Sequence, residues 1–208
     1  MINTPDALRS SALDEETARS ELYGLLALVY YAQPATEFIA QLRAAVTDAP
    51  AAGAFLEEPW RSLVGQARSL SDDAIQGEYN VLFGGMSKPE VYLYGSHFLS
   101  GFLNEKPLAR LRTDLIGLGL ARDEAMSETE DHFAYLCEVM RYLIAGDDVA
   151  VANLTRQREF FTTHIQPWVM TMCYDLQKHP KASFYAAVAE LTRAFMSVEA
   201  QGFDMLET

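Results

Sequence analysis

Cysteine is scarce in this sequence. Only Cys137 and Cys173 occur among the 208 residues, and they do not form a CxxC pair. Two isolated thiols exclude a disulfide framework and a zinc knuckle. Both lie in apolar segments with helical spacing, so we expect them to be buried and reduced, which suits the cytoplasm.

Long apolar runs are also missing. No stretch approaches the roughly 18 apolar residues of a membrane span, so we expect no such helix. The first residues, MINTPDALRSSALDEE, contain no apolar run and carry acidic residues early, unlike a secretory signal peptide. The sequence therefore predicts a cytoplasmic protein.

Positive charge is the third scarcity. The chain has 16 Lys and Arg against 29 Asp and Glu, which gives a formal net charge of −13 and a pI of about 4.6. This balance repels nucleic-acid phosphates and anionic lipid surfaces. It favours either a basic partner or solubility alone.

The residue patterns of metal sites are absent as well. A di-iron bundle needs a Glu-x-x-His motif on two helices, but no glutamate stands three positions before any of the 4 histidines. The histidines and cysteines also lack the spacing of zinc ligands. We therefore expect no bound metal and no cofactor.

Catalytic motifs are equally lacking. Ser96 and His97 are adjacent, but adjacent residues seldom face each other on a helix. There is no GxSxG elbow, and FGGMSKP lacks the second half of a Walker loop. An enzyme is therefore not expected. The alternative that stays open is a small helical protein that binds a cofactor or nucleotide, or a small enzyme.

Helical periodicity is what the sequence does contain. Half of its residues are hydrophobic, and similar apolar stripes at helical spacing recur along most of the chain. One stripe is formed by Phe133, Leu136, Cys137, Met140, Leu143 and Ile144. Only PEVYLYGSHF alternates weakly. The sequence predicts an all-α protein of roughly nine or more helices, folded as one domain over residues 1–208 with a hinge near 119–127.

The segment SETEDHF, residues 127–133, precedes that stripe and has the pattern of a helix start. Ser127 followed by Glu130 predicts a capping box, and Glu128 and Asp131 would then lie in the first turn. This interpretation explains His132 less well, because a cation near a helix N-terminus is mildly unfavourable. We therefore assign Ser127 and Glu130 to the helix start and leave Asp131 and His132 for another role.

Several segments together resemble a known family. EYNVLFGGMSKPEVYLYGSHFLSGFLNEKPL, ETEDHFAYLCEVM, QREFFTTHIQPWVMTMCYDL and ASFYAAVAELTRAFM resemble, in this order, the motifs of the TorD/DmsD/NarJ redox-enzyme maturation chaperones. The resemblance covers roughly residues 20 to 200. The sequence departs from the family pattern twice, because Thr129 and Met86 stand where prolines are usual.

The resemblance implies a TorD-like all-helical fold and a chaperone rather than a catalyst. Members of the family are cytoplasmic and hold the twin-arginine signal peptide and the apo form of a molybdenum enzyme until the cofactor is inserted. YGSHFLSGFLNEKPLARLRTDLIGLGL looks most like the branch associated with formate dehydrogenase. Dimers with exchanged helices occur in the family, so either a monomer or a domain-swapped homodimer fits.

The resemblance also implies a set of peptide-binding residues: Tyr79, Leu82, Phe83, Pro89, Tyr94, Ser96, Glu128, Asp131 and His132. A twin-arginine peptide needs acidic groups for its guanidinium ions and an apolar surface beside them. The acidic residues of 123–138 and nearby aromatic residues could supply both. The alternative for 79, 82 and 83 is core packing, and for 94 and 96 it is anchoring of a loop.

Overall fold

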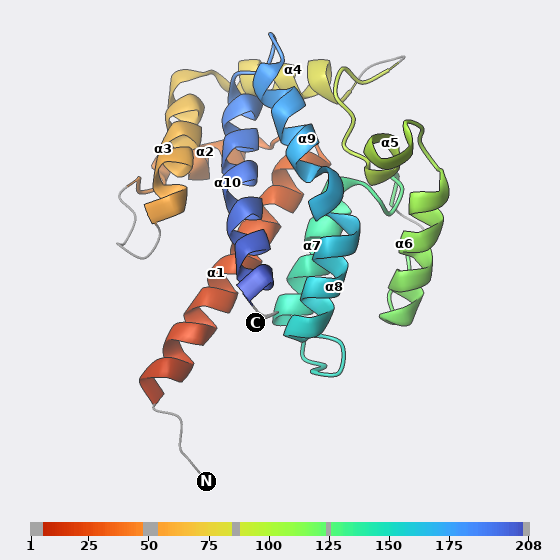
Figure 1. Ribbon diagram of the computed structural model, residues 1–208. Coiled ribbons are helices and arrows are strands. Elements are labelled where there is room, and N and C mark those ends of the chain that lie inside the picture. Colours follow the sequence, from red (N-terminus) through yellow and green to blue (C-terminus); the bar gives the residue numbers. More distant parts are fainter. Residues whose placement is uncertain (1–5, 48–53, 85–87, 124–125, 206–208) are drawn as a thin grey trace.

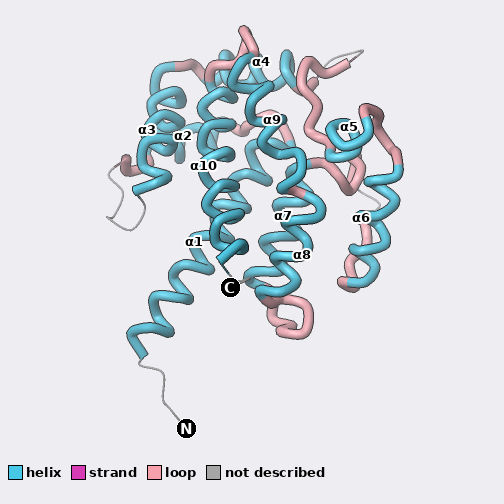
Figure 2. The backbone as a smooth tube through the Cα atoms, in the orientation of Figure 1, coloured by secondary structure: helices cyan, strands magenta, loops and turns pink. Residues whose placement is uncertain are grey.

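The computed structural model describes residues 6–47, 54–84, 88–123 and 126–205, and they form ten helices (Figure 1). The helices are α1 (Asp6–Tyr31), α2 (Thr36–Ala44), α3 (Ala54–Ser69), α4 (Asp72–Leu82), α5 (Gly95–Ser100), α6 (Lys106–Gly117), α7 (Phe133–Ala145), α8 (Leu154–His164), α9 (Gln166–Lys178) and α10 (Phe184–Asp204). The described residues contain no β-strand and a single isolated bridge, between Tyr94 and His132 (Figure 2). The predicted all-α fold of roughly nine or more helices is confirmed.

The core lies between long helices from the two ends of the chain. α1 packs along α7, while α10 packs against both α9 and α3 (Figure 1). The predicted stripe of α7 is buried along its whole length, so the helical period located this face correctly. Cys137 and Cys173 are buried in this core, and burial raises the pKa of both thiols, that of Cys173 to about 12. They are therefore protonated and poorly reactive at neutral pH.

A buried ion pair joins four of the helices. The Arg19 guanidinium donates to both oxygens of Glu199 at 2.7 and 2.8 Å, and the Tyr23 hydroxyl donates to the same carboxylate at 2.9 Å. Arg19 also donates to Gln157, whose amide donates to the carbonyl of Leu143. The network satisfies every charged group that it buries, and it links α1, α7, α8 and α10.

Glu78 connects α4 to the start of α10. Its carboxylate, which is 9% exposed, accepts hydrogen bonds from the backbone N–H groups of Ser183, Phe184 and Tyr185 at 2.8, 3.1 and 2.7 Å. These donors belong to the first turn of α10, where N–H groups have no partner within the helix. A side chain of another helix therefore caps α10 and fixes the direction of α4.

None of the described helices is both long enough and apolar enough to cross a membrane.

Candidate functional site

Two loops that are distant in sequence pair beside the end of α4. The backbone N–H of Gly95 donates to the carbonyl of Asp131 at 3.0 Å, and that of Phe133 donates to the carbonyl of Leu93 at 2.7 Å. The N–H of Val91 donates to the carbonyl of Leu82, the last residue of α4. The three segments that carry the predicted peptide-binding residues therefore meet: the end of α4, residues 88–96, and residues 126–132 (Figure 1).

The predicted capping box is wrong. α7 begins at Phe133, and its N-cap is His132. Glu130 instead forms a bidentate pair with Arg112 of α6 at 3.0 and 2.9 Å, and the Ser127 hydroxyl contacts Glu128 at 3.4 Å. The physical reason is that residues 129–132 form a turn, in which the N–H of His132 donates to the carbonyl of Thr129 at 3.0 Å, and His132 then pairs with Tyr94, so these residues do not enter the helix. Ser127→Ala should therefore not cost the stability of a lost N-cap.

His132 is a neutral capping residue. Its ring is 4% exposed, and burial lowers its pKa to about 4, although Glu128 and Asp131 act in the opposite direction. Nδ1 accepts a hydrogen bond from the N–H of Ala134 at 3.2 Å, so the ring proton lies on Nε2. A histidine at this helix start is therefore not the unfavourable cation that the sequence suggested.

Asp131 anchors the start of α5. Its carboxylate is 3% exposed and accepts hydrogen bonds from the N–H of Ser96 at 2.8 Å and from the Thr129 hydroxyl at 2.6 Å. Ser96 is fully buried, and its own hydroxyl has no hydrogen-bond partner among the described residues. Ser96, Asp131 and His132 thus shape the junction of the two loops, and their side chains offer a partner almost no surface.

Polar residues of the predicted set remain accessible at this junction. Glu128, Tyr79 and Tyr94 are half-buried, and the Tyr94 hydroxyl donates to the Glu128 carboxylate. The Tyr79 hydroxyl donates to the carbonyl of Tyr31 at 3.0 Å. Burial raises the pKa of Tyr79 to about 12, and the nearby Glu128 charge adds to the rise. Both phenols are therefore neutral hydrogen-bonding groups at physiological pH.

The remaining predicted residues lie around this junction. Leu82 is fully buried in the core, and Phe83 packs edge-on against Tyr185 at 4.8 Å between ring centroids. Pro89 is half-buried, next to Glu90, whose carboxylate binds His179 and Lys181. The departure from the family pattern at Met86 lies outside the described residues, as does part of the predicted hinge, residues 124–125.

Two tyrosines that the sequence did not single out complete the site. Tyr31, at the end of α1, is 43% exposed, and its ring centroid lies 5.5 Å from that of Tyr135. The Tyr135 ring is also 5.8 Å from that of His132. Tyr31 lies about one hundred residues before this loop, and Tyr135 lies off the predicted apolar stripe of α7, two residues after Phe133. Neither position carried a signal in the sequence.

The charge at the site is negative and uncompensated. Within the described part of the chain, Glu128 forms no ion pair, whereas the neighbouring Glu130 is paired with Arg112. His132 is neutral and adds no positive charge. The arrangement can therefore attract a cation brought by a partner.

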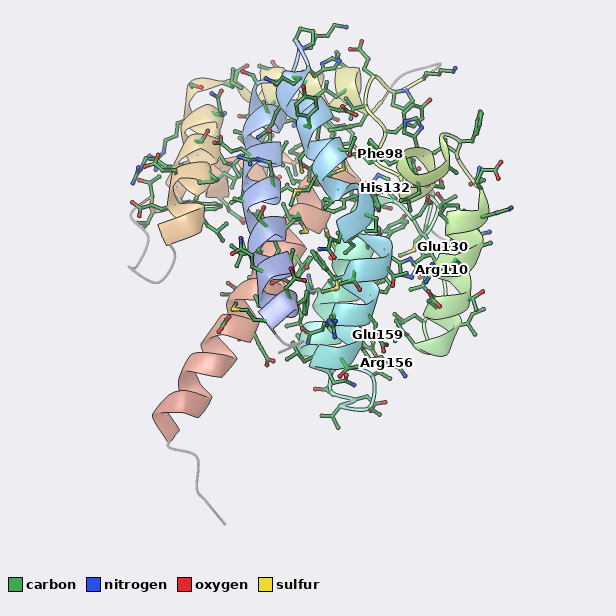
Figure 3. The ribbon with its side chains drawn as sticks, in the orientation of Figure 1. Phe98, Arg110, Glu130, His132, Arg156 and Glu159 are labelled. Carbon is green, nitrogen blue, oxygen red and sulfur yellow. The ribbon has the colours of Figure 1, made fainter. Side chains whose placement is uncertain are left out.

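An apolar surface begins at the same junction. Phe98 stacks on Trp168 with ring centroids 5.3 Å apart, and Figure 3 shows Phe98 and His132 on the side of the molecule near α5. Farther along, Leu99 is 43%, Phe102 70% and Leu103 41% exposed. Leu99 lies within α5, three residues after Ser96, so along the helix this surface begins about 5 Å from the Asp131 anchor at 1.5 Å per residue.

A separate polar pocket lies between α6 and α8. It has a volume of about 390 Å³, and it is lined by Arg110, Thr113, Asp114, Gly117, Leu118, Arg156, Glu159, Phe160, Thr163 and His164 (Figure 3). Its acidic residues are engaged, because Asp114 contacts His164 at 2.8 Å and Glu159 contacts Arg156 at 3.1 Å. None of the predicted site residues lines it. Among the described residues, no three His, Cys, Asp or Glu side chains are grouped so that they could hold a metal ion.

Comparison with known proteins identifies both a family and a fold. The family model for the nitrate reductase delta subunit matches residues 32–174. The chain is similar to the crystal structure of a protein from Archaeoglobus fulgidus described as a redox enzyme maturation protein, with a TM-score of 0.55, 18% identity, and coverage of 86% of this chain and 93% of that one. No curated protein matches the sequence. The structural similarity shows that the two chains share a fold.

Proposed function

The chain belongs to the nitrate reductase delta subunit family of NarJ/TorD-type redox enzyme maturation chaperones, and from this premise we propose that it binds the twin-arginine signal peptide and the apo form of a molybdenum-containing oxidoreductase. It would hold this enzyme in the cytoplasm until the cofactor is inserted. As a chaperone it would provide a binding surface rather than catalysis. The resemblance of residues 94–120 to the formate dehydrogenase branch supports a formate dehydrogenase-like cargo.

The observation that carries the proposal is the unpaired carboxylate of Glu128. It is half-buried beside Tyr94 and forms no ion pair within the described residues. A carboxylate in partly low-dielectric surroundings interacts strongly with a guanidinium ion, which can donate two parallel hydrogen bonds to it. The net charge of −13 adds long-range attraction for a basic segment.

The apolar surface on and after α5 suits the rest of such a peptide. Leu99, Phe102 and Leu103 are exposed there, and an extended peptide covers about 3.5 Å with each residue. An arginine placed at Glu128 would therefore be followed within a few residues by side chains that contact this surface. The arrangement matches a peptide with a basic segment and then an apolar one.

The buried members of the predicted set have a different role in this proposal. Asp131 holds the start of α5, and His132 caps α7. Together they fix the two loops that carry Tyr94 and Glu128. Substitutions at Asp131 or His132 would then weaken binding by displacing those loops, and the melting temperature should fall as well.

Co-purification tests the proposal. The tagged chain is co-expressed with a candidate molybdenum oxidoreductase, with and without its signal peptide, and the captured enzyme is analysed by mass spectrometry and molybdenum content. We expect capture of the cofactor-free enzyme only when the signal peptide is present. Glu128→Gln should reduce the capture. Glu130→Gln is the control, because it makes the same change two residues away at a carboxylate that is already paired with Arg112, and it should leave the capture unchanged. Equal capture of enzyme lacking the signal peptide, or of the cofactor-loaded enzyme, would contradict the proposal.

A further inference from the structure

Four tyrosines from separate parts of the chain form a cluster with Glu128. Tyr31 comes from the end of α1, Tyr79 from α4, Tyr94 from the loop before α5, and Tyr135 from α7. We name Glu128 and these four residues the tyrosine cage. Successive contacts close most of the ring: Tyr79 donates to the Tyr31 carbonyl, the Tyr31 and Tyr135 rings are 5.5 Å apart, and Tyr94 donates to Glu128.

The cage is open on one side and closed on the other. Tyr31 is 43% exposed, and Tyr79, Tyr94 and Glu128 are half-buried. On the closed side, His132 is buried with its ring 5.0 Å from the Tyr94 ring and 5.8 Å from the Tyr135 ring. Glu128 is therefore partly accessible from solvent, and buried aromatic rings lie on its other side.

The hydroxyl of Tyr135 is the unexplained group. The residue is 8% exposed, and its hydroxyl is buried without a hydrogen-bond partner in the part of the chain that the structure describes. Burial raises its pKa to about 12, the neighbouring Tyr31 hydroxyl and the Glu128 charge add to the rise, and the nearby backbone of Glu128 acts in the opposite direction. A neutral phenol buried without a partner costs roughly 1–3 kcal/mol. Simple core packing would be served better by phenylalanine at this position.

The cage also lacks a cation of its own. Glu128 forms no ion pair within the described residues, and Arg112 of α6 is paired with Glu130 at 2.9 Å. The pKa of His132 is lowered to about 4 by burial, so the ring stays uncharged at physiological pH. No positively charged group in the cage neutralises the Glu128 carboxylate.

We propose that the tyrosine cage is a binding site for one guanidinium group, the side chain of an arginine. Glu128 would accept two of its N–H donors, the Tyr135 hydroxyl would accept a third, and the tyrosine faces would contact the planar cation. A carboxylate and aromatic faces favour a cation of either kind. The hydroxyl acceptor and the flat walls favour guanidinium over ammonium, because guanidinium is planar and has five donors in a fixed fork. This arginine would come from the basic segment of the cargo's signal peptide, and that assignment rests on the proposed function above.

Small probes test the cage without the peptide. The protein is titrated with Nα-acetyl-arginine amide and, for comparison, Nα-acetyl-lysine amide, and binding is followed by tyrosine fluorescence and NMR chemical shifts. We expect saturable binding of the arginine probe, with weaker binding of the lysine probe. Glu128→Gln should lower the affinity for the arginine probe by about 10-fold or more, which corresponds to the loss of a charge-assisted hydrogen bond. Glu130→Gln is the matched control and should leave the affinity within about twofold.

Three tyrosine variants separate binding from folding. Tyr135→Phe removes only the unpaired hydroxyl, so the free protein should melt at the same or a higher temperature while the arginine probe binds several-fold more weakly. Tyr31→Leu removes an exposed ring and should weaken binding about 3-fold, while Tyr31→Phe keeps the ring and should bind like the wild type. A purely structural cluster would show the reverse for Tyr135→Phe, with lower stability and unchanged binding.

The outcomes distinguish the cage from the chaperone proposal. If the arginine probe gives no saturable signal, or binds Glu128→Gln as tightly as the wild type, the cage is wrong. A full signal peptide that binds equally well to Glu128→Gln also overturns the cage, while the chaperone proposal stands. If the probe binds in a Glu128-dependent way and no signal peptide binds, the cage stands and the peptide proposal fails.

Discussion

His132 couples the start of α7 to pH. Its Nδ1 must be unprotonated to accept the hydrogen bond from Ala134, and burial lowers its pKa from 6.5 to about 4. The unfolded chain therefore binds a proton at a higher pH than the folded chain does. Stability contributed by this residue is complete above about pH 6.5 and is lost as the pH falls toward 4.

We expect the free energy of unfolding to fall by about 2 kcal/mol between pH 7 and pH 5 because of His132, since one pKa unit corresponds to about 1.4 kcal/mol. His132→Asn provides the comparison, because asparagine is a preferred N-cap that does not titrate. Chemical denaturation of both proteins at the two pH values measures the difference. Parallel pH profiles for the two proteins would show that the buried ring is not the origin of the loss.

Asp131 and Glu128 show what a motif can and cannot predict for single residues. The resemblance placed both in the same functional segment, and the structure brings both to the junction of the two loops. Burial separates their roles, because Asp131 is 3% exposed and Glu128 is half-buried beside Tyr94. A sequence pattern contains no measure of exposure, so it could not show which carboxylate a partner can reach.

At the scale of elements, periodicity predicted helix faces well and helix starts poorly. The apolar stripe of α7 is buried as expected, because burial of one face follows directly from the 3.6-residue period. The start was misplaced by about five residues, because Ser127 and Glu130 satisfy the capping-box pattern while residues 129–132 form a turn that ends where His132 pairs with Tyr94. That pairing depends on a loop more than thirty residues away, and the local sequence does not reveal it.

The cap that Glu78 provides for α10 is another long-range contact. Its carboxylate accepts three backbone hydrogen bonds from residues more than one hundred positions later. It also fixes the end of α4, where Tyr79 belongs to the tyrosine cage. A helix whose first N–H groups are capped in this way depends on the partner helix for its start.

Glu78→Ala should lower the free energy of unfolding by about 3 kcal/mol, because it leaves three buried N–H groups without an acceptor. Glu78→Gln keeps one carbonyl acceptor and should cost less. Glu138→Ala is a control on an exposed carboxylate, whose pair with Arg141 is 3.5 Å long, and should change the stability by less than about 0.5 kcal/mol. A loss for Glu78→Ala no larger than that of the control would mean that water replaces the carboxylate at this helix start.

For the whole molecule, the sequence predicted the fold class and the family, and the geometry of the site came from tertiary contacts. The all-helical fold follows from periodicity, and the ordered series of motifs indicated the family that the family model confirms. Tyr31 and Tyr135 were missed because helix packing alone brings α1 and α7 together at this point. A single domain over residues 1–208 and exchange of helices between two copies stay predictions.

Calorimetric titration of a twin-arginine signal peptide tests the central claim most directly. The peptide is titrated into the wild type, Glu128→Gln and Glu130→Gln at low and physiological salt, together with a control peptide in which glutamines replace both arginines. We expect Glu128→Gln to raise the dissociation constant about 10-fold or more, Glu130→Gln to leave it within about twofold, and added salt to weaken binding because exposed charges are screened within about 8 Å. Equally tight binding of the glutamine peptide to the wild type would contradict the claim that this acidic, aromatic surface binds the arginines.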